Sequence, residues 1–209
     1  MEISGGFWGI ILAAGESKRM QVQKLLLPFQ GISMIEKVIE NVTGSEVDHT
    51  MVVVGCDKDE ILEKIGYLPV SHCLNANYKQ GMLSSVKCGF GSLPAIFEAA
   101  LVFPGDQPLI TAEAVNVVIR AYRQSEKGIV IPVFQKKRGH PLLVSSRYRE
   151  EIEKLDDGEG LRGLALKFPE DVLEVQVNTS GILKDMDTPE EYQKAINQIN
   201  EHYGRIDSF

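Results

Sequence analysis

The chain has 209 residues, of which 44% are hydrophobic, and this is enough to bury one substantial core. Its formal net charge of -7 argues against a nucleic acid or an anionic membrane as a partner, so an anionic ligand must be held by a few local cations. The three cysteines form no CxxC pair and no apolar run reaches membrane-spanning length, which together predict a cytoplasmic protein with reduced thiols.

The first predicted element is a strand that is covered on both faces. The apolar run Phe7–Ala14 contains no alternating polar residues, which is typical of a central strand in a parallel sheet. Gly15 ends the run, and Lys18, Arg19 and Lys24 follow it closely. A glycine lets backbone N–H groups approach an anion and the cations neutralise it, so this turn predicts a phosphate site. An ordinary surface turn after a core strand is the alternative.

The rest of the chain alternates helices with strands. Helices are predicted over Ile32–Val42, after Asp57 with Glu60 in a capping box, over Met82–Phe90, after Thr111, over Arg147–Leu155 and Leu161–Phe168, and after Thr188-Pro189. Strands are predicted over Thr50–Val54, Val70–Leu74, Ala99–Phe103, Gly128–Phe134 and Val172–Val177, and His140–Val144 is expected to pair back with the strand before it. This alternation predicts an α/β fold, a single Rossmann-like three-layer domain with a mainly parallel sheet over residues 1–209.

Three unusual turns share one position in this predicted fold. Gly15–Arg19, Asn75–Gly81 and Gly105–Pro108 each follow a predicted parallel strand. The carboxyl ends of parallel strands meet at the edge where such folds bind ligands. The three turns supply complementary groups, namely an anion cradle, small polar side chains and a carboxylate.

The acidic and polar residues near these turns each have two interpretations. Asp106 fits a Mg²⁺ ligand, since Mg²⁺ takes one or two protein carboxylates plus phosphate oxygens, or it caps a turn. Asp187 is a second metal ligand or an acidic residue that complements the start of the last helix. Gly81 and Ser85 open a helix that either binds a nucleotide or is ordinarily capped. His140, between a glycine and a proline, faces a ligand or is structural.

Other common sites are not present in the sequence. There is no GxxxxGK[ST] motif, the first loop lacks GxGxxG, and no Ser-His-Asp arrangement surrounds a GxSxG elbow. A P-loop, a dinucleotide-binding fingerprint and a hydrolase elbow are therefore excluded.

Several motifs match a known family in order. LAAGESKRM at 12–20 followed by KLLLP at 24–28 resembles the LAAGxSxRMGxPKLLLP signature of the MobA-like nucleotidyltransferase superfamily. NANYKQGMLSS at 75–85, GDQP at 105–108, GHP at 139–141 and DMDTP at 185–189 are similar to its molybdenum cofactor cytidylyltransferase branch. The sequence departs from the pattern at Gln21, where the family has Gly, at Gln23, where it has Pro, and at Tyr78, where it has Trp.

The resemblance implies a reaction in which the terminal phosphate of molybdenum-molybdopterin attacks the α-phosphate of CTP. The products would be molybdopterin cytosine dinucleotide, which a molybdenum hydroxylase would receive, and pyrophosphate. The resemblance implies Mg²⁺ as cofactor, held by Asp106 and Asp187, and His140 at the acceptor. It makes Arg19 and Lys24 catalytic, and it assigns nucleotide binding to Leu12, Ala13, Ala14, Gly15, Ser17, Lys18, Arg19, Lys24, Asn75, Gly81 and Ser85.

The choice of base is implied by LAAG, which is similar to the cytidylyl type. We also expect the methyl groups of Ala13 and Ala14 to narrow the space for a base and to favour CTP over GTP. Two alternatives stay open at this point. One is a nucleotidyltransferase for another phosphorylated acceptor, and the other is a non-catalytic maturation factor that binds the molybdenum cofactor for a hydroxylase.

Overall fold

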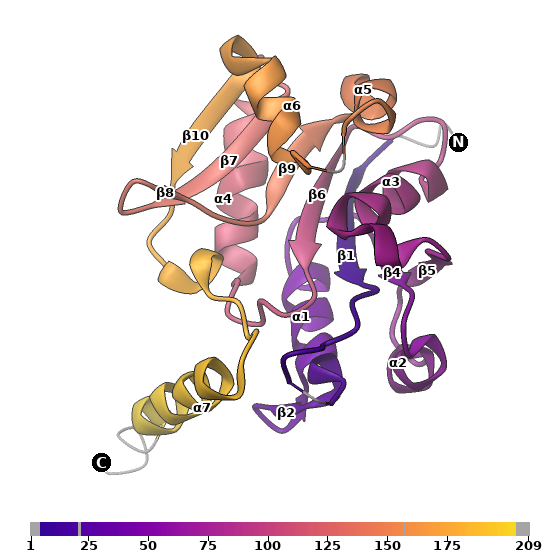
Figure 1. Ribbon diagram of the computed structural model, residues 1–209. Coiled ribbons are helices and arrows are strands. Elements are labelled where there is room, and N and C mark those ends of the chain that lie inside the picture. The colour runs from indigo at the N-terminus through magenta and orange to yellow at the C-terminus, as the bar shows by residue number, and fades with distance from the viewer. Residues whose placement is uncertain (1–4, 21, 157, 204–209) are drawn as a thin grey trace.

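A computed structural model describes residues 5–20, 22–156 and 158–203, so Gln21 lies outside the described residues. Within these ranges the chain forms one large sheet with the strand order β10-β7-β9-β6-β1-β4-β5, and β8 pairs with β7 (Figure 1). The strands are β1 (Phe7–Ala13), β4 (His49–Val54), β5 (Ser71–Leu74), β6 (Ala99–Pro104), β7 (Ile129–Phe134), β8 (Lys137–Arg138), β9 (Leu142–Ser145) and β10 (Val172–Gln176). A separate hairpin joins β2 (Pro28–Phe29) to β3 (Ile32–Ser33).

The sheet is mainly parallel, as predicted. β1 lies between β4 and β6 and is parallel to both, with Ile10 opposite Met51 on one side and Val102 on the other. β5 extends the parallel set beyond β4, and β10 is parallel to β7. The predicted return of the segment after His140 is confirmed, because β9 is antiparallel to β7. β9 is also antiparallel to β6, so it lies between β6 and β7 in the sheet.

The helices match the predicted order with shifted ends. They are α1 (Met34–Thr43), α2 (Lys58–Ile65), α3 (Met82–Ser92), α4 (Ala112–Arg123), α5 (Arg149–Glu153), α6 (Arg162–Lys167) and α7 (Pro189–Tyr203). α1 begins after the predicted start because Ile32 and Ser33 belong to β3. A helix was predicted from Arg147 to Leu155. The observed helix α5 is shorter than this, because a 3-10 turn over Ser146–Tyr148 precedes it. None of the helices in the described ranges is long and apolar enough to cross a membrane.

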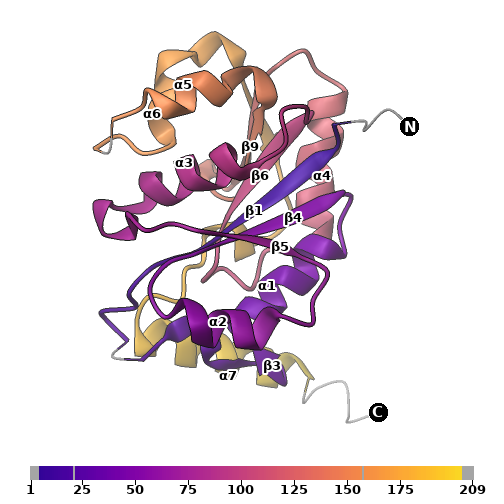
Figure 2. The same cartoon turned by 90° about the vertical axis from the view of Figure 1, so that its right-hand side faces the viewer.

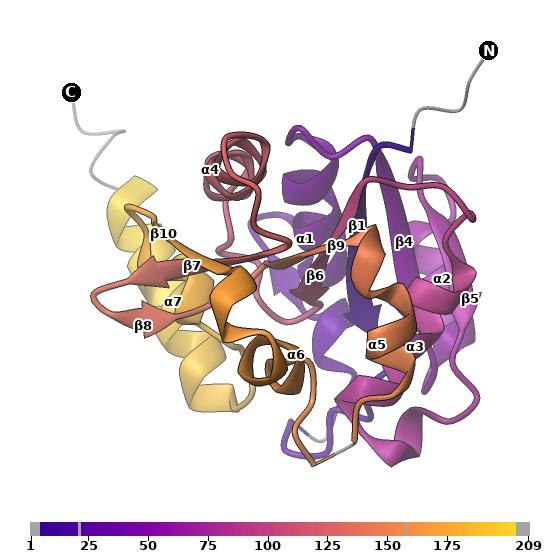
Figure 3. The same ribbon diagram turned by 90° about the horizontal axis from the view of Figure 1, so that it is seen from above.

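The helices cover both faces of the sheet and form the expected three layers. α1, α2, α4 and α7 contribute to one apolar cluster, and α3, α5 and α6 contribute to the other. Figures 2 and 3 show α1 and α4 on one side of the strands and α5 and α6 on the opposite side. β1 supplies both clusters, because Ile11 packs into the first and Ile10 into the second, each fully buried. The two-sided burial that the apolar run predicts is confirmed.

A capping box with additional partners fixes the start of α1. The Ser33 backbone N–H donates to Glu36 Oε2 at 2.8 Å, and the Ser33 hydroxyl and the Tyr67 hydroxyl also donate to this carboxylate. Lys64 Nζ of α2 lies 3.5 Å from Glu36 Oε2. Burial alone raises the pKa of Glu36, but the hydrogen bonds from Ser33 and Tyr67 outweigh it and lower the pKa to about 2. This one carboxylate therefore joins the start of α1 to α2 and to Tyr67.

We predict that Glu36 accounts for part of the acid sensitivity of the fold. Its pKa lies below that of a free glutamate, so its stabilisation is complete above pH 4.5 and is lost as the pH falls toward 2. The shift corresponds to at most about 3 kcal/mol. Glu36→Gln should lower the free energy of unfolding at pH 7 and flatten its dependence on pH in this window. Urea unfolding between pH 7 and pH 3 measures both, with Glu40→Gln as the exposed control on the same helix; an unchanged acid slope in Glu36→Gln would contradict the prediction.

Candidate active site

The three turns singled out in the sequence meet at the carboxyl edge of the sheet. Gly105, after β6, donates its N–H to the carbonyl of Leu12 in β1 at 3.0 Å. Cys56, after β4, donates its N–H to the carbonyl of Ala14 at 3.2 Å. A Cβ on Gly55 would lie 3.0 Å from Cβ of Tyr78, so the turn after β5 packs against the same corner. Strand order therefore brings the three turns together, as the parallel sheet predicts.

The first loop is held in shape by its own side chains. Ser17 has a φ of 49°, in the left-handed region, and its hydroxyl donates to Gln23 Oε1 at 2.8 Å. The N–H of Lys24 donates to Ser17 Oγ at 3.2 Å and that of Leu25 to Gln23 Oε1 at 3.3 Å. Ser17, a predicted nucleotide ligand, thus shapes the loop that presents Lys24.

Gln23 also joins this loop to the start of α2. Its Nε2 donates to Asp57 Oδ2 at 2.9 Å. The predicted capping box at Asp57 is wrong, because Asp57 has a φ of 51° and its side chain accepts no hydrogen bond from the first turn of α2. The carboxylate is directed to the loop instead. A proline at position 23, as in the family pattern, would have no side-chain amide for this contact.

Space for a ligand lies beside the glycine and not beside the alanines. A Cβ on Gly15 would meet nothing within 4 Å, and the residue is exposed. Ala13 is fully buried in the core and Ala14 is 3% exposed, with its methyl group against Gly55. The expectation that these two methyl groups narrow the space for a base is therefore wrong. The side chain of Leu12 is likewise partly buried against the second apolar cluster.

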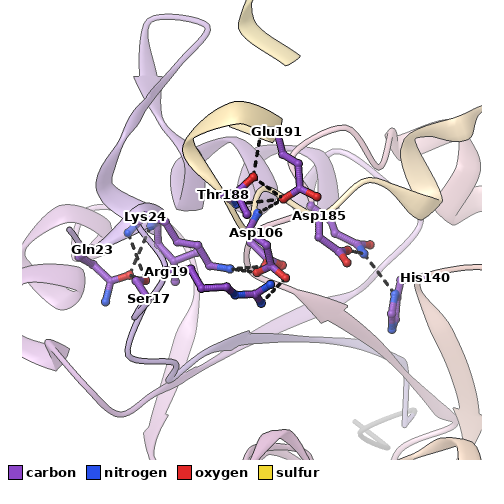
Figure 4. A network of polar contacts seen from close by, with 12 residues as sticks. Ser17, Arg19, Gln23, Lys24, Asp106, His140, Asp185, Thr188 and Glu191 are labelled. Carbon is purple, nitrogen blue, oxygen red and sulfur yellow. Dashed lines mark hydrogen bonds and ion pairs between the residues drawn. The ribbon is translucent and has the colours of Figure 1, made fainter. Parts of the chain in front are cut away.

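The centre of the site is an amine between two carboxylates (Figure 4). Lys24 Nζ lies 2.5 Å from Asp106 Oδ2 and 2.6 Å from Asp187 Oδ1. Arg19 reaches the other oxygen of Asp187, with 2.6 Å between Nη2 and Oδ2. The Lys24 side chain is only 16% exposed, whereas that of Arg19 is 66% exposed. Four of the predicted site residues, from three distant segments, are thus in direct contact.

The charges of this cluster depend on one another. Burial raises the pKa of Asp106 above its ordinary value, although Lys24 opposes this. Burial also acts to raise the pKa of Asp187, but Lys24 and Arg19 outweigh it and the pKa is lowered. The pKa of Lys24 is raised, because the attraction of both carboxylates exceeds the effect of its own burial. The amine therefore stays protonated at neutral pH and neutralises the carboxylates.

The two carboxylates are suitable for Mg²⁺ but do not make a complete protein cage. Asp106 and Asp187 offer hard oxygen donors to one cationic position, which Lys24 Nζ fills. The described residues include no group of three or more His, Cys, Asp or Glu side chains that could hold a metal ion. Mg²⁺ commonly uses one or two protein carboxylates together with substrate phosphates and water, so the donor set fits an ion that binds with a nucleotide.

The turn after β5 uses its polar side chains internally. Asn75 is 4% exposed, and its Nδ2 donates to Ser84 Oγ at 2.9 Å and to Ser85 Oγ at 3.0 Å. The hydroxyl of Ser84 donates back to the carbonyl of Gly81 at 2.8 Å. Asn75 and Ser85 therefore fix the start of α3. Gly81, with a φ of 106° and nothing within 4 Å of an added Cβ, leaves room in front of the free N–H groups of the first helical turn.

Lys18 and His140 lie away from the contacts that Lys24 makes with the two carboxylates. Lys18 pairs with Glu16 at 2.8 Å and is not in contact with the carboxylate pair that Lys24 joins. His140 lies on the other side of Asp106, where its Nδ1 is 3.4 Å from Gln107 Nε2 (Figure 4). Gln107 also donates to Asp185. Sequence reasoning did not assign roles to Gln107 or Asp185, although both lie inside motifs that it identified, at GDQP and DMDTP.

Comparison with known proteins gives a consistent result. The MobA-like NTP transferase domain family matches residues 9–172. The chain is 26% identical over 196 residues to the molybdenum cofactor cytidylyltransferase of Escherichia coli strain K12, with 92% of this chain and 96% of that protein covered. It is 31% identical over 149 residues to a probable molybdenum cofactor guanylyltransferase of Thermococcus gammatolerans, with 70% and 73% covered. A solved nucleotidyl transferase from Methanothermobacter thermautotroptrophicus has a TM-score of 0.79 at 22% identity, with 96% and 98% covered.

We predict that Gln23 keeps the first loop closed. Gln23→Met preserves the length of the side chain but removes its hydrogen bonds with Ser17, Leu25 and Asp57. The amides of Lys24 and Leu25 should then exchange with solvent faster, and the free energy of unfolding should fall by about 1 kcal/mol. Hydrogen exchange by mass spectrometry measures the first effect and urea unfolding the second. Gln124→Met, at an exposed site on the C-terminal end of α4, is the matched control; equal exchange in both variants would refute the role of Gln23.

Proposed function

The chain belongs to the MobA-like NTP transferase family, and we propose that it transfers the CMP group of CTP to the terminal phosphate of molybdenum-molybdopterin. An oxygen of that phosphate would attack the α-phosphorus, the bond from the α-phosphorus to the bridging oxygen would break, and pyrophosphate would leave. The observation that best supports this is the Lys24 amine held between two carboxylates beside the open glycine loop. The segments that form the proposed site extend from Leu12 to Asp187. We therefore assign this site to a single domain of residues 1–209.

The first loop would hold the triphosphate. The open position beside Gly15 allows backbone N–H groups to approach phosphate oxygens, and Arg19 is exposed next to it. Phosphoryl transfer depends on positioning and charge stabilisation, and one preorganised charge contact contributes on the order of 3 kcal/mol to the barrier. Lys24 would supply such a contact only after leaving its carboxylate partners. The proposed catalytic amine therefore exchanges Asp106 and Asp187 for the triphosphate.

The carboxylates that Lys24 releases would hold Mg²⁺. When bound, the ion would neutralise charge on the triphosphate and on the leaving pyrophosphate. Asp106 is fixed at the end of β6, and its carbonyl accepts the N–H of Met186 at 3.0 Å, which keeps the segment before α7 beside it. This backbone contact holds the carboxylate of Asp187 close to that of Asp106 independently of Lys24.

The acceptor would bind on the side of Asp106 that carries His140, opposite the first loop. A molybdenum hydroxylase would take up the product. Five of the other predicted nucleotide ligands divide into two groups in this proposal. Ser17, Asn75 and Ser85 shape the two turns, whereas the backbone at Gly15 and Gly81 contacts the nucleotide.

Guanylyl transfer is the second candidate for the base. The relatives named above include a cytidylyltransferase and a probable guanylyltransferase. The methyl groups of Ala13 and Ala14 cannot decide between the bases, because they are buried. The proposal of CTP rests on the LAAG, GMLSS and GHP segments and on the match to the cytidylyltransferase along nearly the whole of both chains.

A direct assay tests the reaction. Purified protein with Mg²⁺ and molybdenum-molybdopterin should release pyrophosphate from CTP with a kcat/KM at least about tenfold above that for GTP, ATP or UTP, a difference of about 1.4 kcal/mol. A preference for GTP would replace the cytidylyl proposal with a guanylyl one. Tight binding of the cofactor without pyrophosphate release from any nucleotide would favour the maturation factor, and turnover with other phosphate monoesters but not this cofactor would favour another acceptor.

We predict that Lys24 competes with divalent metal when no nucleotide is bound. Lys24→Met removes the cation between Asp106 and Asp187, so Mn²⁺ should bind this variant about tenfold more tightly than the wild type, and Asp106→Asn should bind it more weakly. Turnover of Lys24→Met should fall roughly a hundredfold.

Calorimetric titration with Mn²⁺ without nucleotide measures the affinity. Lys58→Met is the matched control, since Lys58 is exposed at the start of α2 and pairs there with its neighbour Asp59. Equal affinity of wild type and Lys24→Met would show that Asp106 and Asp187 do not share a metal site.

A further inference from the structure

A chain of polar contacts leads away from the charged centre to the acceptor side. Gln107 is 3% exposed, and its Nε2 donates to Asp185 and lies 3.4 Å from Nδ1 of His140 (Figure 4). Asp185 itself is exposed, and the His140 residue is half-buried. The buried amide thus lies between a solvated carboxylate and the imidazole.

The direction of these hydrogen bonds follows from the chemistry of the groups. An ionised carboxylate only accepts, so the nitrogen of the Gln107 amide, and not its oxygen, must face Asp185. That nitrogen carries a second hydrogen, which is available to Nδ1 of His140 at 3.4 Å. Nδ1 must then accept, and the single proton of the neutral imidazole is left on Nε2.

The ring has little tendency to take up a second proton. Burial lowers the pKa of His140 to about 4; Asp106 acts to raise this pKa, whereas Arg162 acts to lower it. His140 is therefore neutral at pH 7, with one N–H to offer a ligand.

Backbone hydrogen bonds hold the main chain at His140 in place. The N–H of His140 donates to the carbonyl of Ile182 at 3.0 Å, and that of Gly139 to the carbonyl of Pro132 at 2.9 Å. A Cβ on Gly139 would lie 2.3 Å from the oxygen of Ile182, so only glycine permits this approach. The position of the His140 main chain is therefore set by β7 and by the segment before α7.

We propose that Gln107 is a positioning residue that fixes His140 as the Nε2–H tautomer, and that this N–H donates to an oxygen of the acceptor's terminal phosphate. The proposal rests on the proposed function, because that phosphate is the nucleophile. A neutral imidazole suits the task, since it holds the phosphate without transferring a proton to the attacking oxygen. An imidazolium would neutralise the nucleophile.

The free energy of unfolding distinguishes the positioning role of Gln107 from a purely structural role. Oε1 of Gln107 is buried and has no hydrogen-bond partner among the described residues, which costs stability. Asp185 is exposed and can be solvated if its partner is removed. Gln107→Met, which fills the same volume without polar atoms, should therefore unfold at the same or a higher urea concentration than the wild type.

Imidazole nitrogen NMR at pH 7 tests the tautomer without any substrate. The His140 signals, assigned by their loss in His140→Asn, should show a protonated Nε2 and an unprotonated Nδ1 in the wild type. Gln107→Met should leave only the intrinsic preference of a neutral imidazole for Nε2–H, so that the Nδ1–H tautomer becomes detectable beside it. A protonated Nδ1 in the wild type, or an unchanged tautomer in Gln107→Met, would overturn the role of Gln107, and neither result depends on catalysis.

Kinetics test the contact with the acceptor. Gln107→Met should raise KM for molybdenum-molybdopterin about tenfold, a loss of about 1.4 kcal/mol, and leave KM for CTP unchanged. His140→Gln, which can place an amide near the position of Nε2, should retain more activity than His140→Asn, whose amide lies near that of Nδ1. An unchanged acceptor KM in Gln107→Met, or equal activity of the two His140 variants, would refute the contact. Lack of turnover in the wild type would refute the proposed function and leave the NMR result standing.

Discussion

The ion pairs of Lys24 are the constraint on which the arrangement of the site depends. They join the first loop, the end of β6 and the segment before α7, which lie 82 and 163 residues from Lys24 along the sequence. Both carboxylates are partly buried. A partly buried carboxylate without a counter-charge lowers the stability of the fold. The amine therefore fixes the side chains of three segments whose backbones are already joined by the hydrogen bonds from Gly105 to Leu12 and from Met186 to Asp106. The core beneath contributes by fixing the ends of β1 and β6 side by side.

Sequence patterns predicted the features that depend on the local chain. The two-sided burial of β1, the mainly parallel sheet, and the caps at Thr111 and Thr188 follow from apolar periodicity and short motifs, and the structure confirms them. The meeting of the three turns also follows, because parallel strands with right-handed crossovers leave their carboxyl ends at one edge. The motif resemblance assigned Lys24, Asp106 and Asp187 to one site, but it did not predict that the amine pairs directly with both carboxylates.

The features that were missed depend on partners from other elements. The pattern at Asp57 fits a helix cap, but Gln23, 34 residues away, provides a donor for its carboxylate, and the backbone adopts a left-handed conformation. The methyl group of Ala13 is buried in the first apolar cluster and that of Ala14 lies against Gly55, which a motif does not reveal. The roles of Gln107 and His140 require the donor and acceptor directions across three segments. Local patterns specify which residues are buried, and only tertiary contacts specify what they bond to.

The charge balance of the site links its two ligands. The protein has a net charge of -7, and the cations Lys24 and Arg19 are already paired with acidic side chains, so a free triphosphate meets little unpaired positive charge at the centre. In the proposed reaction, a triphosphate that attracts Lys24 leaves Asp106 and Asp187 without their counter-ion. A divalent cation between these carboxylates restores neutrality and, in turn, frees Lys24 for the phosphates. By thermodynamic linkage each ligand then increases the affinity of the other by the same factor. Nucleotide and metal would accordingly bind together, because either one alone leaves a buried charge uncompensated.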